Sequence, residues 1–203
     1  MISEKMKGYV ENGSAIRAMF EEGKKMADRF GAENVYDFSL GNPAAPVPEE
    51  VKKSIYDILE NRNANFVHCY MPNAGYPEVR EKVAANLNKK YNSSFTKDDI
   101  IMTVGAAGGI NCVLRSLLEP EDEVLCFAEY NSYVMNFGGN LKVVPADYET
   151  FQLNVEEADK YITERTKAVI INNPNNPSGV VYNKETLIRL QKMLEKAEER
   201  IGH

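Results

Sequence analysis

Residues 168–179 read AVIINNPNNPSG, and this stretch governs how the rest of the sequence is interpreted. Its first part, Ala168–Ile171, is an apolar and mostly β-branched run of the kind that forms a buried strand. The prolines that follow end the strand, because proline fixes φ and has no N–H to give to a sheet. The turn Asn172–Gly179 is therefore expected at the carboxyl end of a strand, where open α/β sheets bind their ligands. From the residue types alone, a structural turn is the favoured interpretation.

Helical patterns alternate with short apolar runs on the N-terminal side of this stretch and after it. The alternation predicts an α/β fold with three layers, in which helices cover both faces of a mostly parallel sheet. The expected strands are a run near Ile100, Val124–Phe127, Leu141–Val144 and Ala168–Ile171. The expected helices are Ser14–Phe30, one from near Pro48, one from Pro77, one from the glycine-rich turn to Leu118, Tyr133–Phe137, Val155–Ile162 and Asn183–Arg200. Ser14 is expected to cap the first helix and Gly31 to follow its end.

Length and composition describe a globular chain with room for one sizeable core, since 43% of the 203 residues are hydrophobic and 27% are charged. The net charge of −6 argues against a nucleic-acid surface, which needs clustered Lys and Arg. Every apolar run is far shorter than the roughly 20 residues that span a membrane. The N-terminus lacks the pattern of a secretory signal, so we expect a cytoplasmic protein.

The cysteines and histidines do not suggest a metal centre or a disulfide framework. Cys69, Cys112 and Cys126 are widely spaced and lie in mostly apolar surroundings, which favours reduced thiols in the core. His68 and His203 have no other ligand at a metal-binding spacing. We therefore expect no metal site.

A glycine-rich segment, Met102–Ile110, joins an expected strand to an expected helix through small residues. Such a turn leaves backbone N–H groups uncovered at the positive end of the helix dipole, where a phosphate binds well. The spacing of its glycines matches neither a P-loop nor a dinucleotide-binding fingerprint. By itself the segment is equally well explained by close packing of a helix on a sheet.

Four motifs together resemble the fold type I aminotransferases, enzymes that depend on pyridoxal phosphate. The segment Asn173–Gly179 is similar to the family motif Asn-Pro-x-Asn-Pro-Thr/Ser-Gly. Leu40–Pro43 resembles an N-terminal Gly-x-Pro loop, and Tyr70–Arg80 resembles a Tyr-x(4)-Gly-x(3)-Leu-Arg element. Val104–Gly108 resembles the phosphate-binding turn. The resemblance covers nearly all of the sequence in the right order and is strongest to the aspartate and aromatic amino-acid group.

The resemblance implies a role for several residues in holding pyridoxal phosphate and substrate. Gly105, Ala106 and Ala107 correspond to the backbone cradle of the cofactor phosphate, without the hydroxyl donors that relatives often have at the alanines. Asn176 corresponds to the donor to the phenolic oxygen of the cofactor ring. The remaining assignments are Tyr70, which in the family reaches the phosphate of a neighbouring subunit and so implies a homodimer, and Gly41, which lies near the substrate carboxylate.

The aromatic residue that stacks on the cofactor ring has two possible assignments. Relatives usually carry Pro-aromatic-aromatic-x-x-Tyr after the strand that corresponds to Val124–Phe127, whereas this sequence reads AEYNSY at residues 128–133. The Tyr-x-x-Tyr spacing makes Tyr130 the stacking residue. The other alignment places Tyr130 after that loop, with about four residues lost, and a partly buried aromatic at a strand end is an equally good description.

The resemblance also implies what the sequence does not supply, so no catalytic residue is assigned. In the family, the lysine that holds the cofactor, the aspartate on its pyridine nitrogen and the arginine on the substrate carboxylate lie beyond the position of His203. We expect residues 1–45 to form an N-terminal arm and small-domain segment, and residues 46–203 a partial, truncated cofactor-binding large domain.

The function expected for the parent protein is transfer of an amino group between an amino acid and a 2-oxo acid, with this chain alone inactive. Whether the chain is itself an enzyme stays open. The alternatives are a noncatalytic degenerate fragment, or another fold type I enzyme such as a carbon–sulfur lyase or a decarboxylase.

Overall fold

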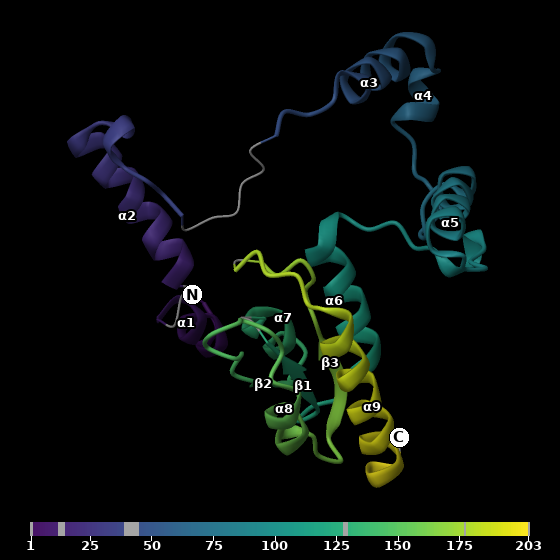
Figure 1. Ribbon diagram of the computed structural model, residues 1–203. Coiled ribbons are helices and arrows are strands. Elements are labelled where there is room, and N and C mark those ends of the chain that lie inside the picture. The colour runs from purple at the N-terminus through teal and green to yellow at the C-terminus, as the bar shows by residue number, and fades with distance from the viewer. Residues whose placement is uncertain (1, 12–14, 39–44, 128–129, 177, 203) are drawn as a thin grey trace. The chain divides into compact units, whose positions relative to one another are not determined.

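The computed structural model describes residues 2–11, 15–38, 45–127, 130–176 and 178–202, and Figure 1 shows their helices and strands. The chain divides into two compact units. One comprises Met1–Asn42 with Leu117–His203, and the other comprises Pro43–Ser116. Each unit is described by itself below, and the expected domain boundary after residue 45 stays a prediction.

The first unit is built on a parallel sheet of three strands, β1 (Glu123–Cys126), β2 (Asn140–Val143) and β3 (Thr166–Ile170), in the order β2-β1-β3. All four residues of β1 are buried, as expected for a central parallel strand covered on both faces. Leu125 pairs with Lys142 of β2 and Val169 of β3. The parallel α/β fold predicted from the sequence is therefore confirmed.

Helices α8 (Val155–Tyr161) and α9 (Lys184–Ile201) pack on this sheet (Figure 1). Their buried residues Ala158 and Ala197 join Leu125 of β1 in one apolar cluster. Small residues at the contact let both helices approach the sheet closely. Each helix is capped at its start by an asparagine: Asn154 accepts from the backbone N–H of Glu157, and Asn183 accepts from that of Thr186. A shorter helix, α7 (Asn131–Met135), follows β1 and contacts β2.

The N-terminal part of the first unit contains α1 (Glu4–Glu11), α2 (Ala15–Phe30) and the 3-10 turn η1 (Ala32–Asn34). Gly31 ends α2 with a φ of +86°, which confirms the expected glycine after the helix. The expected cap Ser14 lies outside the described residues.

The second unit contains α3 (Glu49–Asn61), α4 (Ala64–Val67), α5 (Pro77–Tyr91), the 3-10 turn η2 (Lys97–Asp99) and α6 (Gly105–Leu117), whose last residue is counted with the first unit. Pro77 occupies the first turn of α5, as predicted, because its missing N–H is not needed there. None of the helices in the described part of the chain is both long and apolar enough to cross a membrane.

Two expectations from the sequence are wrong. The run near Ile100 forms no strand: the N–H of Met102 donates to the carbonyl of Ala74, at 2.9 Å, and the Ile100 carbonyl accepts from Arg80. A strand needs a hydrogen-bonded neighbouring strand, and the described residues offer this run none. The expectation that all three thiols lie in the core holds only for Cys126, since Cys69 and Cys112 are exposed.

Candidate functional site

The turn that follows β3 carries the predicted cofactor contact Asn176. Its backbone is closed by two hydrogen bonds, from the N–H of Asn175 to the carbonyl of Val180 (2.8 Å) and from the N–H of Gly179 to the carbonyl of Asn175 (2.7 Å). The hydroxyl of Ser178 donates to Oδ1 of Asn175 at 2.8 Å. The turn is thus a hydrogen-bonded structure at the carboxyl end of β3, where the sequence places it.

Asn176 itself is exposed at the tip of this turn. Its carboxamide makes no hydrogen bond with any other described residue, whereas the side chains of Asn173 and Asn175 are both engaged. An asparagine whose donor and acceptor are both free of intramolecular partners retains its full capacity to bind a ligand.

Tyr130 lies close to the same turn, because β1 and β3 are parallel neighbours and their carboxyl ends meet at one edge of the sheet. The ring is half-buried, and its centroid is 6.0 Å from that of Tyr133. Burial raises the pKa of the Tyr130 hydroxyl, and a hydrogen bond with the Asn172 side chain partly opposes that rise. The structure therefore brings Tyr130 to the first residues of the Asn-Pro turn.

The glycine-rich turn belongs to the second unit, where α6 begins at Gly105. Gly105 has a φ of +67°, and a Cβ at this position would have no atom within 4 Å. Ala106 and Ala107 are exposed in the first turn of the helix, where backbone N–H groups have no acceptor within the helix. Thr103 secures the turn by donating its hydroxyl to the Gly105 carbonyl at 3.1 Å. The N–H of Gly105 itself donates to the carbonyl of Thr103 at 3.0 Å, so of the three predicted cradle residues only Ala106 and Ala107 keep an N–H for an anion.

Tyr70 and Arg80 also lie in the second unit and differ in exposure. The Tyr70 side chain is fully exposed. Arg80 is largely buried, and its guanidinium donates to the carbonyls of Gly75 (3.2 Å) and Lys97 (2.7 Å). Arg80 therefore stabilises the chain around Gly75 and is not poised for a ligand. The predicted substrate contact Gly41 lies outside the described residues.

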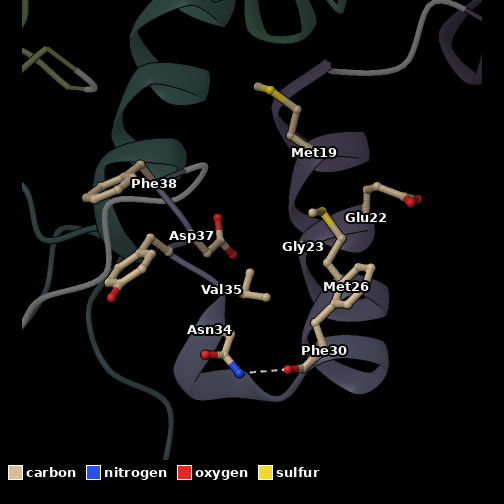
Figure 2. A pocket seen from close by; sticks show the side chains of 10 residues that line it. Met19, Glu22, Gly23, Met26, Phe30, Asn34, Val35, Asp37 and Phe38 are labelled. Atoms are coloured by element: carbon tan, nitrogen blue, oxygen red, sulfur yellow. Dashed lines mark hydrogen bonds between the residues drawn. The ribbon is translucent and has the colours of Figure 1, made fainter.

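A separate hollow of about 640 Å³ lies between α2 and residues 34–38 of the first unit (Figure 2). Its walls are mostly apolar, and the labelled carboxylates of Glu22 and Asp37 border it. Gly23 permits the Asp37 side chain to approach α2, since a Cβ there would stand 3.3 Å from the Asp37 carboxylate. The described lining includes no Lys or Arg, so this hollow offers no positive charge to the phosphate of pyridoxal phosphate or to an amino acid's carboxylate.

Pyridoxal phosphate offers a phosphate, a phenolic oxygen and a flat ring, and the described residues fit each group. In the first unit, the carboxamide of Asn176 has no partner among the described residues and suits the oxygen, and Tyr130 supplies an aromatic face. In the second unit, taken by itself, the N–H groups of Ala106 and Ala107 suit a phosphate. Sequence reasoning did not identify Tyr182, whose hydroxyl accepts a hydrogen bond from Asn175 of the turn after β3. The one sequence feature that could have indicated it is the presence of an aromatic residue three positions after the motif Asn173–Gly179.

A family model described as aminotransferase class I and II matches residues 32–201. A probable aspartate aminotransferase from Methanocaldococcus jannaschii is 31% identical over 96% of this chain and 49% of its own length. An aromatic-amino-acid aminotransferase from Thermococcus litoralis is 36% identical over 87% of this chain and 44% of its own length. The crystal structure of an aminotransferase from Eubacterium rectale is 38% identical, with a TM-score of 0.91, and the match covers 100% of this chain and 52% of that one. The chain thus spans about half the length of these relatives.

Proposed function

The chain belongs to the class I and II aminotransferases, and from this premise we propose that its parent protein transfers an amino group between an amino acid and a 2-oxo acid with pyridoxal phosphate as cofactor. The observation that carries the proposal is the exposed carboxamide of Asn176, which has no partner among the described residues. It lies in a turn whose first residue, Asn172, hydrogen-bonds to Tyr130 at the carboxyl ends of neighbouring parallel strands. The names of the relatives, which include aspartate and aromatic-amino-acid aminotransferases, support an amino-acid substrate.

The residues of this chain have the task of holding and tuning the cofactor. When bound, pyridoxal phosphate supplies the electron sink that makes the bonds of the substrate α-carbon labile. Asn176 donates a hydrogen bond to the phenolic oxygen and favours its anionic form. Ala106 and Ala107 offer backbone N–H groups to the phosphate, assisted by the positive end of the α6 dipole. Gly105 donates its own N–H to the Thr103 carbonyl, and its part in the cradle is to leave the approach free of a side chain. Tyr130 covers one face of the ring.

Two further residues are assigned contacts outside the cofactor ring of the same subunit in this proposal. Gly41 lets the backbone approach the substrate carboxylate, because it has no side chain to obstruct it. Tyr70 reaches the cofactor phosphate of a second subunit, so the parent protein is a homodimer. The complete exposure of the Tyr70 side chain within its own unit supports this role.

The chain alone is proposed to bind pyridoxal phosphate weakly at most and to turn over no substrate. The covalent anchor and proton shuttle of the family is a lysine, and the lysines that flank the Asn-Pro motif, Lys167 and Lys184, are exposed surface residues. In this proposal, neither lysine replaces the one that anchors the cofactor in the family. The proposal therefore assigns the chain a cofactor-holding part and assigns the chemistry to residues outside it.

A chimera tests the function directly. Residues 1–203 are fused to the part of the Eubacterium rectale enzyme that the structural match leaves uncovered, and the product is assayed with L-aspartate or L-phenylalanine and 2-oxoglutarate. We expect transamination by the chimera and none by the 203-residue chain. In the chimera, Asn176→Ala removes a hydrogen bond to a charged oxygen and is expected to lower kcat/KM by about tenfold or more.

The matched control is Asn86→Ala, which removes an exposed asparagine on α5 and is expected to leave kcat/KM unchanged. A chimera that folds and binds pyridoxal phosphate but transfers no amino group would contradict the proposed reaction. Turnover by the chain alone would contradict its assignment as a part that only holds the cofactor.

A further inference from the structure

We propose that Tyr182 is a positioning residue whose buried hydroxyl holds the Asn-Pro turn in the shape that presents Asn176. The contact between Asn176 and a cofactor rests on the proposed function, but the role of Tyr182 in shaping the turn does not. Tyr182 lies outside every motif discussed above, and its side chain is 5% exposed.

The ring of Tyr182 anchors the turn to the core of the first unit. It belongs to a cluster of buried residues with Leu153, which precedes α8, Val155, which begins α8, and Leu190 of α9. Burial raises the pKa of the hydroxyl, and the hydrogen bond from Asn175 acts in the opposite direction. A buried hydroxyl needs a partner, and here the partner is part of the turn.

Asn175 connects this anchor to Asn176. Its Nδ2 donates to the Tyr182 hydroxyl at 3.0 Å, and its Oδ1 accepts from the Ser178 hydroxyl at 2.8 Å. Both ends of the carboxamide are therefore held, and the backbone of the residue directly before Asn176 is held with them. The held backbone fixes the position and direction of the Cα–Cβ bond of Asn176, from which its carboxamide extends.

Additional hydrogen bonds fix the segment around Tyr182. Its backbone N–H donates to Oδ1 of Asn173 at 2.9 Å, so Tyr182 contacts the turn at two points. On either side of it, the side chain of Gln152 donates to the Val181 carbonyl (3.2 Å) and accepts from the Asn183 N–H (3.1 Å). The tyrosine is thus held firmly enough to orient what it binds.

Hydrogen exchange of backbone amides tests this role in the chain itself. Tyr182→Phe keeps the buried ring and removes only the hydroxyl. We expect the amides of Asn175 and Gly179, whose hydrogen bonds close the turn, to exchange at least tenfold faster in this variant. The amide of Leu125 in the central strand should exchange at its original rate, because the fold stays intact.

The matched control is Tyr161→Phe. The ring of Tyr161 packs against the cluster that contains Leu125 and Ala158, and its hydroxyl makes no hydrogen bond with a described residue. This substitution should leave the exchange of Asn175 and Gly179 unchanged. Unchanged exchange in Tyr182→Phe, or an equal acceleration at Leu125, would overturn the proposal, since the hydroxyl would then be irrelevant or its effect would be global.

Substitutions at Asn175 give a second and independent readout. Asn175→Asp keeps the acceptor for Ser178 and accepts from the Tyr182 hydroxyl, so slow exchange at Gly179 should persist. Asn175→Ala also loses the bond from Ser178, so it should exchange at least as fast as Tyr182→Phe, and the double variant should be no faster than Asn175→Ala alone. Additive effects of the two substitutions would count against the proposal.

The chimera links this role to the cofactor. Tyr182→Phe is expected to raise the apparent Kd for pyridoxal phosphate severalfold, and Tyr161→Phe is not. Faster exchange with an unchanged Kd would refute the relevance of the turn to the cofactor, and an inactive chimera would count against the proposed function. In either case the exchange data alone decide whether Tyr182 shapes the turn.

Discussion

Gly139 offers a sharp test of packing in the sheet unit. A Cβ at this position would stand 3.0 Å from Cδ1 of Leu118, 3.0 Å from Cγ1 of Val134 and 3.3 Å from the backbone oxygen of Asp122. Carbon atoms prefer separations of about 3.5–4.0 Å, so all of these neighbours would have to move. Leu118 and Val134 are buried, and the Asp122 oxygen is held by a 2.8 Å hydrogen bond from Asn140.

Gly139→Ala is therefore expected to destabilise the unit despite the usual benefit of replacing glycine. Overpacking lowers the free energy of unfolding by about 1–3 kcal/mol. The reduced conformational freedom of the unfolded chain raises it by roughly 0.4–1 kcal/mol. The net loss in the free energy of unfolding is about 1–2 kcal/mol, which lowers Tm by about 2–8 °C for a chain of this size. Urea and thermal unfolding followed by circular dichroism measure both quantities.

The matched control is Gly108→Ala in α6, where an added Cβ would meet Thr103 and Val104 at ordinary distances of 3.7 and 3.8 Å. We expect this variant to be at least as stable as the wild type, because alanine favours helix. If Gly139→Ala is as stable as the Gly108→Ala control, the reasoning from close contacts is refuted.

Three further predictions concern the core, the glycine-rich turn and pH. Leu125→Ala empties a fully buried position and should lower the free energy of unfolding by about 3 kcal/mol in urea titrations; a loss below about 1 kcal/mol would contradict the assignment of β1 as the centre of the core. Gly105→Ala should lower it by about 1 kcal/mol through its positive φ, and unchanged thermal unfolding would show that the turn relaxes without strain. Burial raises the pKa of both Tyr130 and Tyr182 above 10.0, so the folded state keeps protons that the unfolded state loses, and stability should fall as the pH rises past about 10. Urea midpoints between pH 9 and about 11.5 measure this fall, which should be smaller in Tyr130→Phe; an equal fall in that variant would exclude Tyr130 as a source.

The strands show what an apolar pattern predicts well and what it does not. The predicted strand Val124–Phe127 is β1 shifted by one residue, because side-chain type locates a buried run but not the hydrogen bonds at its ends. The run near Ile100 has a similar composition and forms no strand. Its backbone bonds to Ala74, Lys97 and Arg80 instead, and sequence composition carries no information about such partners.

The candidate site was predicted in part. The motif placed Asn176 after a strand and at the carboxyl end of the sheet, since both features depend on residues adjacent in sequence. The proximity of Tyr130 to Asn172 was not predicted, because it depends on which strands are neighbours. The bond between Tyr182 and Asn175 was missed for a related reason: nothing in either residue type specifies the other as its partner.

The position of β3 in the sheet has a consequence for how this chain behaves in solution. Within the described strands, β3 is paired on one side only, and a hollow of about 630 Å³ runs between it and α9. The outward edge of such a strand presents a row of N–H and C=O groups that act as a template for another extended segment. Lys167, exposed on that strand, places a charge on this template and makes self-pairing less favourable. Storage at low concentration and low salt, where like charges on separate molecules repel most strongly, is therefore the condition in which the chain should stay monodisperse longest.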